Sequence, residues 1–264
     1  MRDRIRSIAH RVYVRWIRHH LSQEIDRQRL KLLIWDIWGY GRLVFLPTIP
    51  VLERVRVLRR FLRIDWNVLH GHKPCEISEV CRALAERPGA PGEVMVEAGC
   101  WQGGSSAKFS ILCKMFGYEL WIYDSFRGVE AMTAEEKKDS YDFSGEYAAP
   151  ESLLRSHLDA YGEPDVCSIY PGWFAETLAV GPLPRPVRLA YIDCDLAKGT
   201  REALIGIVPV LVEDGWIFSQ DFHIGPVRRL LEDAGTWDEL SRGAPTIRHI
   251  VRNLAGIRFG SRVQ

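Results

Sequence analysis

The chain has 264 residues, of which 47% are hydrophobic, and it carries a formal net charge of +1. This length and composition suit one large α/β domain with an added segment, and the near-neutral charge argues against a nucleic-acid partner. The six cysteines show no CxxC or other metal-type spacing, so we expect reduced thiols and a cytoplasmic location. No apolar run reaches the roughly 18 residues of a membrane span.

The first segment, residues 1 to about 65, is rich in arginine and aromatic residues. Its first apolar positions recur at helical spacing: Ile5, Ile8, Val12 and Trp16. This spacing predicts an amphipathic helix. We expect the segment to pack on protein, either its own domain or a second subunit, because Trp35, Trp38 and Tyr40 suit a buried interface. A basic helix on a membrane surface is the less favoured alternative.

A second helix is predicted near residues 76–87 and ends at Pro88-Gly89. We place a domain boundary there, between an N-terminal helical and aromatic extension, residues 1–88, and a second domain, residues 89–264. Strand candidates then follow at Val94–Ala98, Glu119–Asp124, Val166–Tyr170, Val187–Asp193 and Gly215–Gln220. The helices expected between them are Ser106–Phe116, Ser152–Tyr161 and Thr200–Val212. This alternation predicts a parallel sheet that is covered on both faces.

The last part of the chain has a different pattern. Thr246–Arg252 and Ile257–Val263 are β-rich, and the short turn Asn253–Gly256 separates them, which predicts an antiparallel hairpin. A parallel sheet that ends in such a hairpin is typical of a Rossmann-like, class I methyltransferase dependent on S-adenosylmethionine (SAM). The polar stretch Val129–Pro150 is too long for an ordinary connection and is expected to form a lid.

A glycine-rich loop, VEAGCWQGGSS, follows the first predicted strand. Because glycine has no side chain, the backbone at this point can approach a nucleotide-like ligand closely above the strand ends. The spacing from Glu97 to Gly99 and Gly103 departs from the dinucleotide GxGxxG pattern and fits a SAM-binding loop better. Asp124 ends the next strand, where an acid can bind ribose hydroxyls. We therefore favour SAM as the ligand, with NAD as the alternative.

Three acids end two later strands, in RLAYIDCDL and WIFSQDFH. Alternation directs Asp193 and Asp195 to one side of the sheet, where they can converge with Asp221. Without a cation these carboxylates would repel one another, and Mg²⁺ prefers such oxygen ligands. The ion would hold a substrate hydroxyl and lower its pKa. The alternative is that they are ordinary loop or helix-capping acids.

At these motifs the chain, over residues 90–235, resembles the macrocin O-methyltransferase-like family of SAM- and metal-dependent sugar O-methyltransferases. Six motifs occur in the family's order: EAGCWQGGSS, YDSFRG, SGEYAAPESLLRSHLDAYG, YPGWFAETL, IDCDL and SQDFH. The resemblance implies a SAM site formed by Glu97, Gly99, Cys100, Trp101, Gly103, Ser105, Asp124, Ser125, Gly172, Trp173 and Asp193. It also implies a metal site formed by Asp193, Gln220 and Asp221.

The resemblance makes Asp195 the general base, and His223 is a second candidate for a catalytic role. Gln220 stands where the family has an acid, and Phe222-His223 replace its usual tyrosine. His70 and His72 are expected to be loop or substrate-contacting residues rather than metal ligands.

The expected activity is SAM- and Mg²⁺-dependent methylation of a hydroxyl of a sugar or glycosylated natural product. The expected partners are a small-molecule or glycan acceptor and further copies of this chain in a homo-oligomer. Three alternatives stay open: a catechol-like phenol as acceptor, a SAM-binding protein with lost or weak catalysis, and an NAD-dependent oxidoreductase.

Overall fold

The computed structural model describes residues 24–134, 136–240, 242–251 and 253–260, apart from the side chain of Trp35. The amphipathic helix predicted from Ile5 to Trp16 lies outside the described residues. Within them, no helix is long and apolar enough to cross a membrane.

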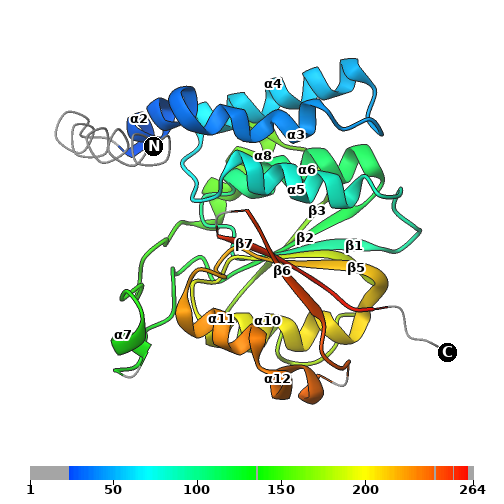
Figure 1. Cartoon of the computed structure of the whole chain (residues 1–264). Coiled ribbons are helices and arrows are strands. Elements are labelled where there is room, and N and C mark those ends of the chain that lie inside the picture. The colour runs from blue at the N-terminus through cyan, green and yellow to red at the C-terminus, as the bar shows by residue number, and fades with distance from the viewer. Residues whose placement is uncertain (1–23, 135, 241, 252, 261–264) are drawn as a thin grey trace, which may run out of the picture.

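The core of the molecule is a seven-stranded sheet with the order β3-β2-β1-β4-β5-β7-β6 (Figure 1). The strands are β1 (Val94–Ala98), β2 (Glu119–Asp124), β3 (Cys167–Pro171), β4 (Val187–Ile192), β5 (Leu211–Ser219), β6 (Thr246–Val251) and β7 (Leu254–Arg258). The first five are parallel, and β7 lies antiparallel between β5 and β6. The predicted parallel sheet with a terminal hairpin is therefore confirmed.

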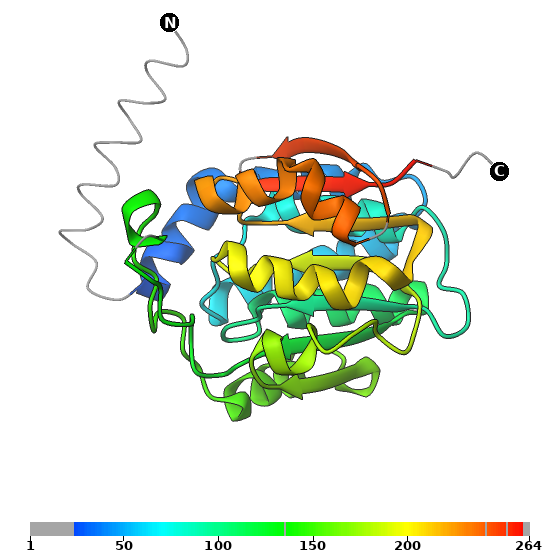
Figure 2. The same ribbon diagram turned by 90° about the horizontal axis from the view of Figure 1, so that it is seen from below.

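Helices cover both faces of the sheet, because successive side chains of each buried strand point to opposite sides. Met95 packs in the core on one face, whereas Val94 and Val96 pack in the core on the other. The first face carries α5 (Pro74–Leu84), α6 (Gly104–Phe116) and α8 (Glu151–Tyr161). The second carries α9 (Phe174–Thr177), α10 (Ala197–Ile207), α11 (Gly225–Glu232) and α12 (Ala234–Glu239). Figure 2 shows α10, in yellow, running along this second face.

The N-terminal extension forms an additional layer outside α5, α6 and α8 (Figure 1). It comprises α2 (Glu24–Lys31), a π turn (Leu32–Asp36), a 3₁₀ turn (Ile37–Tyr40), α3 (Gly41–Val44) and α4 (Val51–Asn67). Tyr40 is buried within the chain, whereas Trp38 is 81% exposed. The predicted boundary at residue 88 falls in the turn between α5 and β1. Because the inner sides of α4 and α5 share one apolar core with the sheet, the division into two domains stays a prediction.

Several predicted element boundaries were wrong. The strand predicted to begin at Gly215 begins at Leu211, and the helix predicted near residues 76–87 is Pro74–Leu84. The helix expected to reach Val212 ends at Ile207 and is followed by a 3₁₀ turn, because Pro209 has no N–H to continue the helix. The hairpin turn expected at residues 253–256 is shorter, and β7 already begins at Leu254. Leu254 and Ala255 are fully buried, so packing outweighs the turn-forming tendency of the flanking asparagine and glycine.

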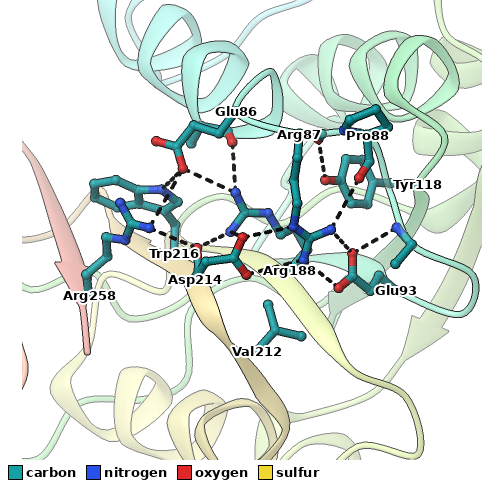
Figure 3. Close-up of polar contacts among 12 residues, drawn as sticks. Glu86, Arg87, Pro88, Glu93, Tyr118, Arg188, Val212, Asp214, Trp216 and Arg258 are labelled. Atoms are coloured by element: carbon teal, nitrogen blue, oxygen red, sulfur yellow. Dashed lines mark hydrogen bonds and ion pairs between the residues drawn. The ribbon is translucent and has the colours of Figure 1, made fainter. Parts of the chain in front are cut away.

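At the amino ends of the parallel strands lies an arginine network, formed by Glu86, Arg87, Glu93, Arg188 and Asp214 (Figure 3). Arg87 donates to both carboxylate oxygens of Glu93 at 2.6 Å and to Asp214 at 2.8 Å. Arg188 is 1% exposed and donates to the backbone oxygen of Asp214 and, at 3.2 Å, to Glu86. These pairs tie α5 to β4 and β5 at the end of the sheet away from the strands' carboxyl ends.

Candidate active site

A cavity of about 280 Å³ opens at the carboxyl ends of the parallel strands. Eleven of the residues expected at the site line it: Gly99, Cys100, Trp101, Ser105, Asp124, Ser125, Trp173, Asp193, Asp195, Gln220 and His223. Four others lie behind its wall: Glu97, Gly103, Gly172 and Asp221. The structure thus brings the glycine loop and the acids into one chamber.

The glycine loop is shaped by close contact with the end of β4. Gly99 has a φ of +90°, and a Cβ there would overlap the carbonyl oxygen of Asp193. Gly103, with a φ of +83°, begins α6, and Trp101 between them also has a positive φ of +48°. Glycine is required at the first position because no side chain fits between the two strand ends.

Glu97 lies beneath this loop rather than in the cavity. Its side chain is fully buried and accepts a hydrogen bond of 2.6 Å from the Ser106 hydroxyl at the start of α6. Burial raises the pKa of Glu97 to about 8. The geometry suits a residue that holds the loop against α6.

Asp124, at the end of β2, braces the loop from the other side. Its Oδ2 accepts from the backbone N–H groups of Cys100 at 2.8 Å and Trp101 at 3.2 Å, and its Oδ1 accepts from Phe126 at 2.7 Å. A carboxylate has about four acceptor positions, so Asp124 keeps about one for a ligand in the cavity. The sequence predicted that Asp124 contacts a ligand, but it did not indicate that Asp124 also accepts hydrogen bonds from the backbone of the glycine loop.

Asp193, Asp195 and Asp221 form a second group, the acid cluster, in which one oxygen of each lies within 4.8 Å of the others. Asp221, from the turn after β5, accepts from the backbone N–H groups of Cys194 at 2.7 Å and Asp195 at 2.8 Å. These bonds fold the chain after β4 so that Asp195 takes a φ of +60°, a conformation that aspartate tolerates better than most residues.

Within the described residues, no cation is among the charged groups that act most strongly on Asp193 and Asp195. Burial raises the pKa of Asp193 well above its usual range, and the carboxylates of Asp221 and Asp195 raise it further. Burial and the charge of Asp221 raise the pKa of Asp195 to about 8. Burial raises the pKa of Asp221 to about 6, although the two backbone donors oppose this. The charged groups that act most strongly on Asp193 are all carboxylates, so a bound cation would relieve the cluster.

Gln220 completes this group. One terminal atom of its amide lies 3.2 Å from Oδ1 of Asp221 and 3.3 Å from Oδ1 of Asp193. Turned one way, the amide NH₂ donates to both carboxylates. Turned the other way, its carbonyl oxygen joins two carboxylates in an all-oxygen set of the kind that hard divalent cations prefer. His223 also lines the cavity, and its charge lowers the pKa of Asp221.

The wall opposite the acids comes from the N-terminal side of the chain. His70 and His72 line the cavity, and their rings stack at 4.0 Å. Behind them, Lys108 of α6 donates to Asp65 of α4, and its Nζ lies 2.6 Å from Nε2 of His72. Asp65 and the two histidines have metal-ligand spacing. The buried ammonium of Lys108 already supplies the positive charge there.

The predicted lid contributes Glu130, Phe143 and Tyr147 to the cavity. The Tyr147 ring meets Trp101 edge-on at 5.3 Å, and Glu130 pairs with Lys198 of α10 at 2.6 Å. Sequence reasoning did not identify Glu130, nor Glu202 and Asn253, which also line the cavity. Nothing in the local sequence marks these three, because distant segments bring them to the site.

A second cavity, of about 390 Å³, adjoins the first and shares Trp101, Tyr147 and the 69–72 loop with it. Its outer wall is formed by α2. Gln28 of α2 donates to the backbone oxygens of Asp65 at 2.7 Å and Val68 at 2.8 Å. These bonds hold α2 against the end of α4, at the wall of the second cavity. The N-terminal extension therefore helps to shape the space next to the site.

The strand order, the glycine loop and the acid at the end of β2 together define a class I SAM-dependent methyltransferase fold. Residues 69–243 match the macrocin O-methyltransferase (TylF) family, and the chain belongs to that family. The resemblance seen in the sequence is thereby confirmed, and the chain is an O-methyltransferase.

Two relatives are named as O-methyltransferases, and the name of the first contains a rhamnosyl group. An 8-demethyl-8-(2,3-dimethoxy-α-L-rhamnosyl)-tetracenomycin-C 4′-O-methyltransferase of Streptomyces olivaceus is 29% identical over 187 residues, which cover 66% of this chain and 71% of that protein. A mycinamicin III 3″-O-methyltransferase of Micromonospora griseorubida is 26% identical over 178 residues, which cover 63% and 69%.

Two solved structures share the fold. The O-methyltransferase NovP has a TM-score of 0.59 at 19% identity, over 70% of this chain and 79% of its own. The calicheamicin methyltransferase CalS11 has a TM-score of 0.57 at 20% identity, over 91% of this chain and 95% of its own.

Proposed function

We propose that this chain is a SAM- and Mg²⁺-dependent O-methyltransferase that methylates a hydroxyl of a sugar or glycosylated natural product. The acid cluster carries the proposal, because Asp193 and Asp195 share one cavity with the glycine loop and the charged groups acting most strongly on them are other carboxylates. The reactions named for the two relatives favour a sugar as the acceptor.

The residues present fit both groups. For SAM, the bare backbone of the loop and the remaining acceptor position of Asp124 face the cavity, and Trp173 and Ser125 also line it. For the ion, Asp193, Asp221 and the Gln220 carbonyl provide oxygen ligands, with one charge fewer than three carboxylates would give. We therefore expect Mg²⁺ to bind, but more weakly than it would to three acids.

When bound, SAM supplies the methyl group and Mg²⁺ supplies Lewis acidity that makes an acceptor hydroxyl easier to deprotonate. Asp195 then accepts the hydroxyl proton, since its carboxylate lines the cavity beside Asp193. Asp221 acts through the backbone, because its bonds to the N–H groups of Cys194 and Asp195 hold this turn in place. His223 is the second candidate for the proton acceptor.

The lid and the N-terminal side bind and orient the acceptor. Tyr147 and Phe143 present aromatic faces to the cavity, a surface suited to covering a sugar ring. The adjoining cavity under α2 would receive the rest of a glycosylated molecule. Closure of these walls also excludes water from the site of transfer.

Binding and turnover are tested separately. Isothermal titration calorimetry should show that S-adenosylhomocysteine binds and NAD does not, and the reverse order would exclude a methyltransferase. Methyl transfer from SAM is then followed by mass spectrometry with deoxysugar glycosides and with a catechol as acceptors. We expect methylated glycoside only, with Mg²⁺ present and not with EDTA.

The alternatives give different results in the same assays. Methylation of the catechol alone would make a phenol the acceptor. Binding of S-adenosylhomocysteine without transfer to any acceptor would favour a SAM-binding protein with lost catalysis, for which Gln220 is the structural argument. Full transfer in EDTA would leave the acid cluster without a metal role.

A further inference from the structure

The outer side of the N-terminal extension exposes an apolar surface, which we call the outer face. Nine of the twelve large hydrophobic side chains that are exposed in the described part of the chain lie between residues 33 and 66. They are Leu33, Ile34, Trp38, Val44, Phe45, Val51, Leu52, Val55 and Trp66. Trp38 and Phe45 are 81% and 80% exposed, which is unusual for side chains of this size.

The outer face lies on the outermost layer of the molecule (Figure 1). The opposite side of α4 is buried, with Val57, Phe61 and Ile64 packed in the core. Among the described residues, no element covers the outer face. The cavity opens at the carboxyl ends of the strands, so a partner on the outer face would leave the active site accessible.

Charge distinguishes this part of the chain from the rest. The first 65 residues contain 15 arginines and lysines against six acidic residues, a net charge of +9, whereas the remaining residues have a net charge of −8. Beyond the apolar first turns of α4, the exposed side of the helix continues with Arg56, which pairs with Glu53, and Arg59, and Arg63 stacks on the Tyr161 ring of α8. The apolar surface is therefore bordered by positive charge.

We propose that the outer face docks on a membrane surface that contains anionic lipids. Exposed tryptophan and phenylalanine suit the boundary between head groups and acyl chains, and arginines beside them are attracted to anionic head groups. Two copies pairing through this face would bring two segments of +9 together, so charge disfavours a dimer here. The enzyme would be peripheral, with its cavity open to the aqueous phase.

Flotation of the full-length protein with vesicles tests this directly. We expect the protein to float with phosphatidylcholine vesicles that contain phosphatidylglycerol, less with phosphatidylcholine alone, and less at high salt because salt screens the charges. Trp38→Ser with Phe45→Ser should lower the bound fraction several-fold, and Arg56→Glu with Arg59→Glu should do the same. Val180→Ser is the matched control, because Val180 is 73% exposed but lies after α9, away from this face.

Size-exclusion chromatography with light scattering separates the other outcomes. No flotation, together with a dimer that Trp38→Ser and Phe45→Ser dissociate, would show that the outer face joins two copies and would overturn the proposal. No flotation of a monomer would also overturn it. Because all four altered side chains are exposed, thermal melts of the variants should match wild type. Methyl transfer to a soluble glycoside should be unchanged in every variant, so the result is independent of the proposed activity.

Discussion

Two charged groups lie at opposite ends of the same strands, and their charges are arranged differently. In the arginine network, each acid faces a guanidinium: Glu93 and Asp214 pair with Arg87, and Glu86 pairs with Arg188. In the acid cluster, carboxylates face one another and an amide. The first arrangement lowers the pKa values of Glu93 and Asp214, and the second raises those of Asp193 and Asp195.

The difference separates a structural role from a functional one. In a balanced network each charge has its partner, so removing one partner would destabilise the fold by leaving the other charge unpaired. An unbalanced cluster destabilises the protein without a ligand and is relieved when a cation binds. Both groups are rich in charge, so charge alone would not have identified the active site.

The largest expected effect is on turnover. Asp193→Asn keeps the shape of the side chain and removes a charge from the acid cluster, so methyl transfer should fall by about 100-fold or more, the loss of several kcal/mol of metal stabilisation. Affinity for S-adenosylhomocysteine, measured by calorimetry, should change little. Asp214→Asn, the matched change in the arginine network, should leave kcat unaltered. Wild-type turnover by Asp193→Asn would give the cluster a structural role.

The second prediction concerns pH, and the two groups should respond in opposite directions. The folded-state pKa values of Asp195 and Glu97, about 8, and of Asp221, about 6, lie above those of the unfolded chain. Their contribution to stability is complete below about pH 4 and is lost as the pH rises through these values. Without metal, the free energy of unfolding should therefore fall from about pH 5 to about pH 8, by about 1.4 kcal/mol per pH unit for each proton retained.

For the arginine network the sign reverses. Hydrogen bonds from Arg87 lower the pKa values of Glu93 and Asp214, so their contribution is present at neutral pH and is lost as the pH falls below about 4. Urea unfolding in EDTA at a series of pH values measures both the fall in stability above about pH 5 and the fall below about pH 4. Added Mg²⁺ should reduce the part of the fall in stability above pH 5 that comes from Asp195 and Asp221. It should leave the part from Glu97, and the fall below about pH 4, unchanged. If Mg²⁺ left the fall in stability between about pH 5 and pH 8 unchanged, the assignment of the acid cluster as a metal site would be contradicted.

The third prediction tests the structural role of the arginine network. Arg188→Met should lower the free energy of unfolding by about 1–3 kcal/mol, because it removes hydrogen bonds to the backbone oxygen of Asp214 and to Glu86. Turnover of the folded enzyme should equal that of wild type. Chemical denaturation and steady-state kinetics on the same sample test both statements, and a loss of kcat without a loss of stability would contradict them.

The smallest effect is expected at Gln220, where the amide can be converted into a family-like acid. Gln220→Glu should tighten Mg²⁺ binding on the order of tenfold, because an added anion near the ion gains Coulomb energy that desolvation partly offsets. The same change should destabilise the metal-free protein. Gln220→Met, which removes the oxygen, should weaken Mg²⁺ binding. Competition of Mg²⁺ with paramagnetic Mn²⁺ measures both, and equal affinities in all three proteins would place Gln220 outside the metal site.

Local sequence was sufficient for much of the fold. The residues of β1 and β2 were predicted with correct bounds, because β1 is a fully buried apolar run and both strands are bounded by glycines or polar residues. The glycine loop and the acids after β4 and β5 were also found, because each is a short pattern that lies directly after a predicted strand. The hairpin turn was misplaced because Leu254 and Ala255 are buried by β5, a contact that local spacing does not encode.

What the sequence by itself determined is the family, the order of strands and helices, and the residue types at the strand ends. What only the tertiary structure decided is how these groups act on one another. Asp124 and Asp221 use backbone N–H groups to brace the loops beside them, and Lys108 neutralises Asp65 behind the two histidines. These relations depend on distances between segments far apart in the chain, and the energy of a buried charge is set by what lies within a few ångströms of it.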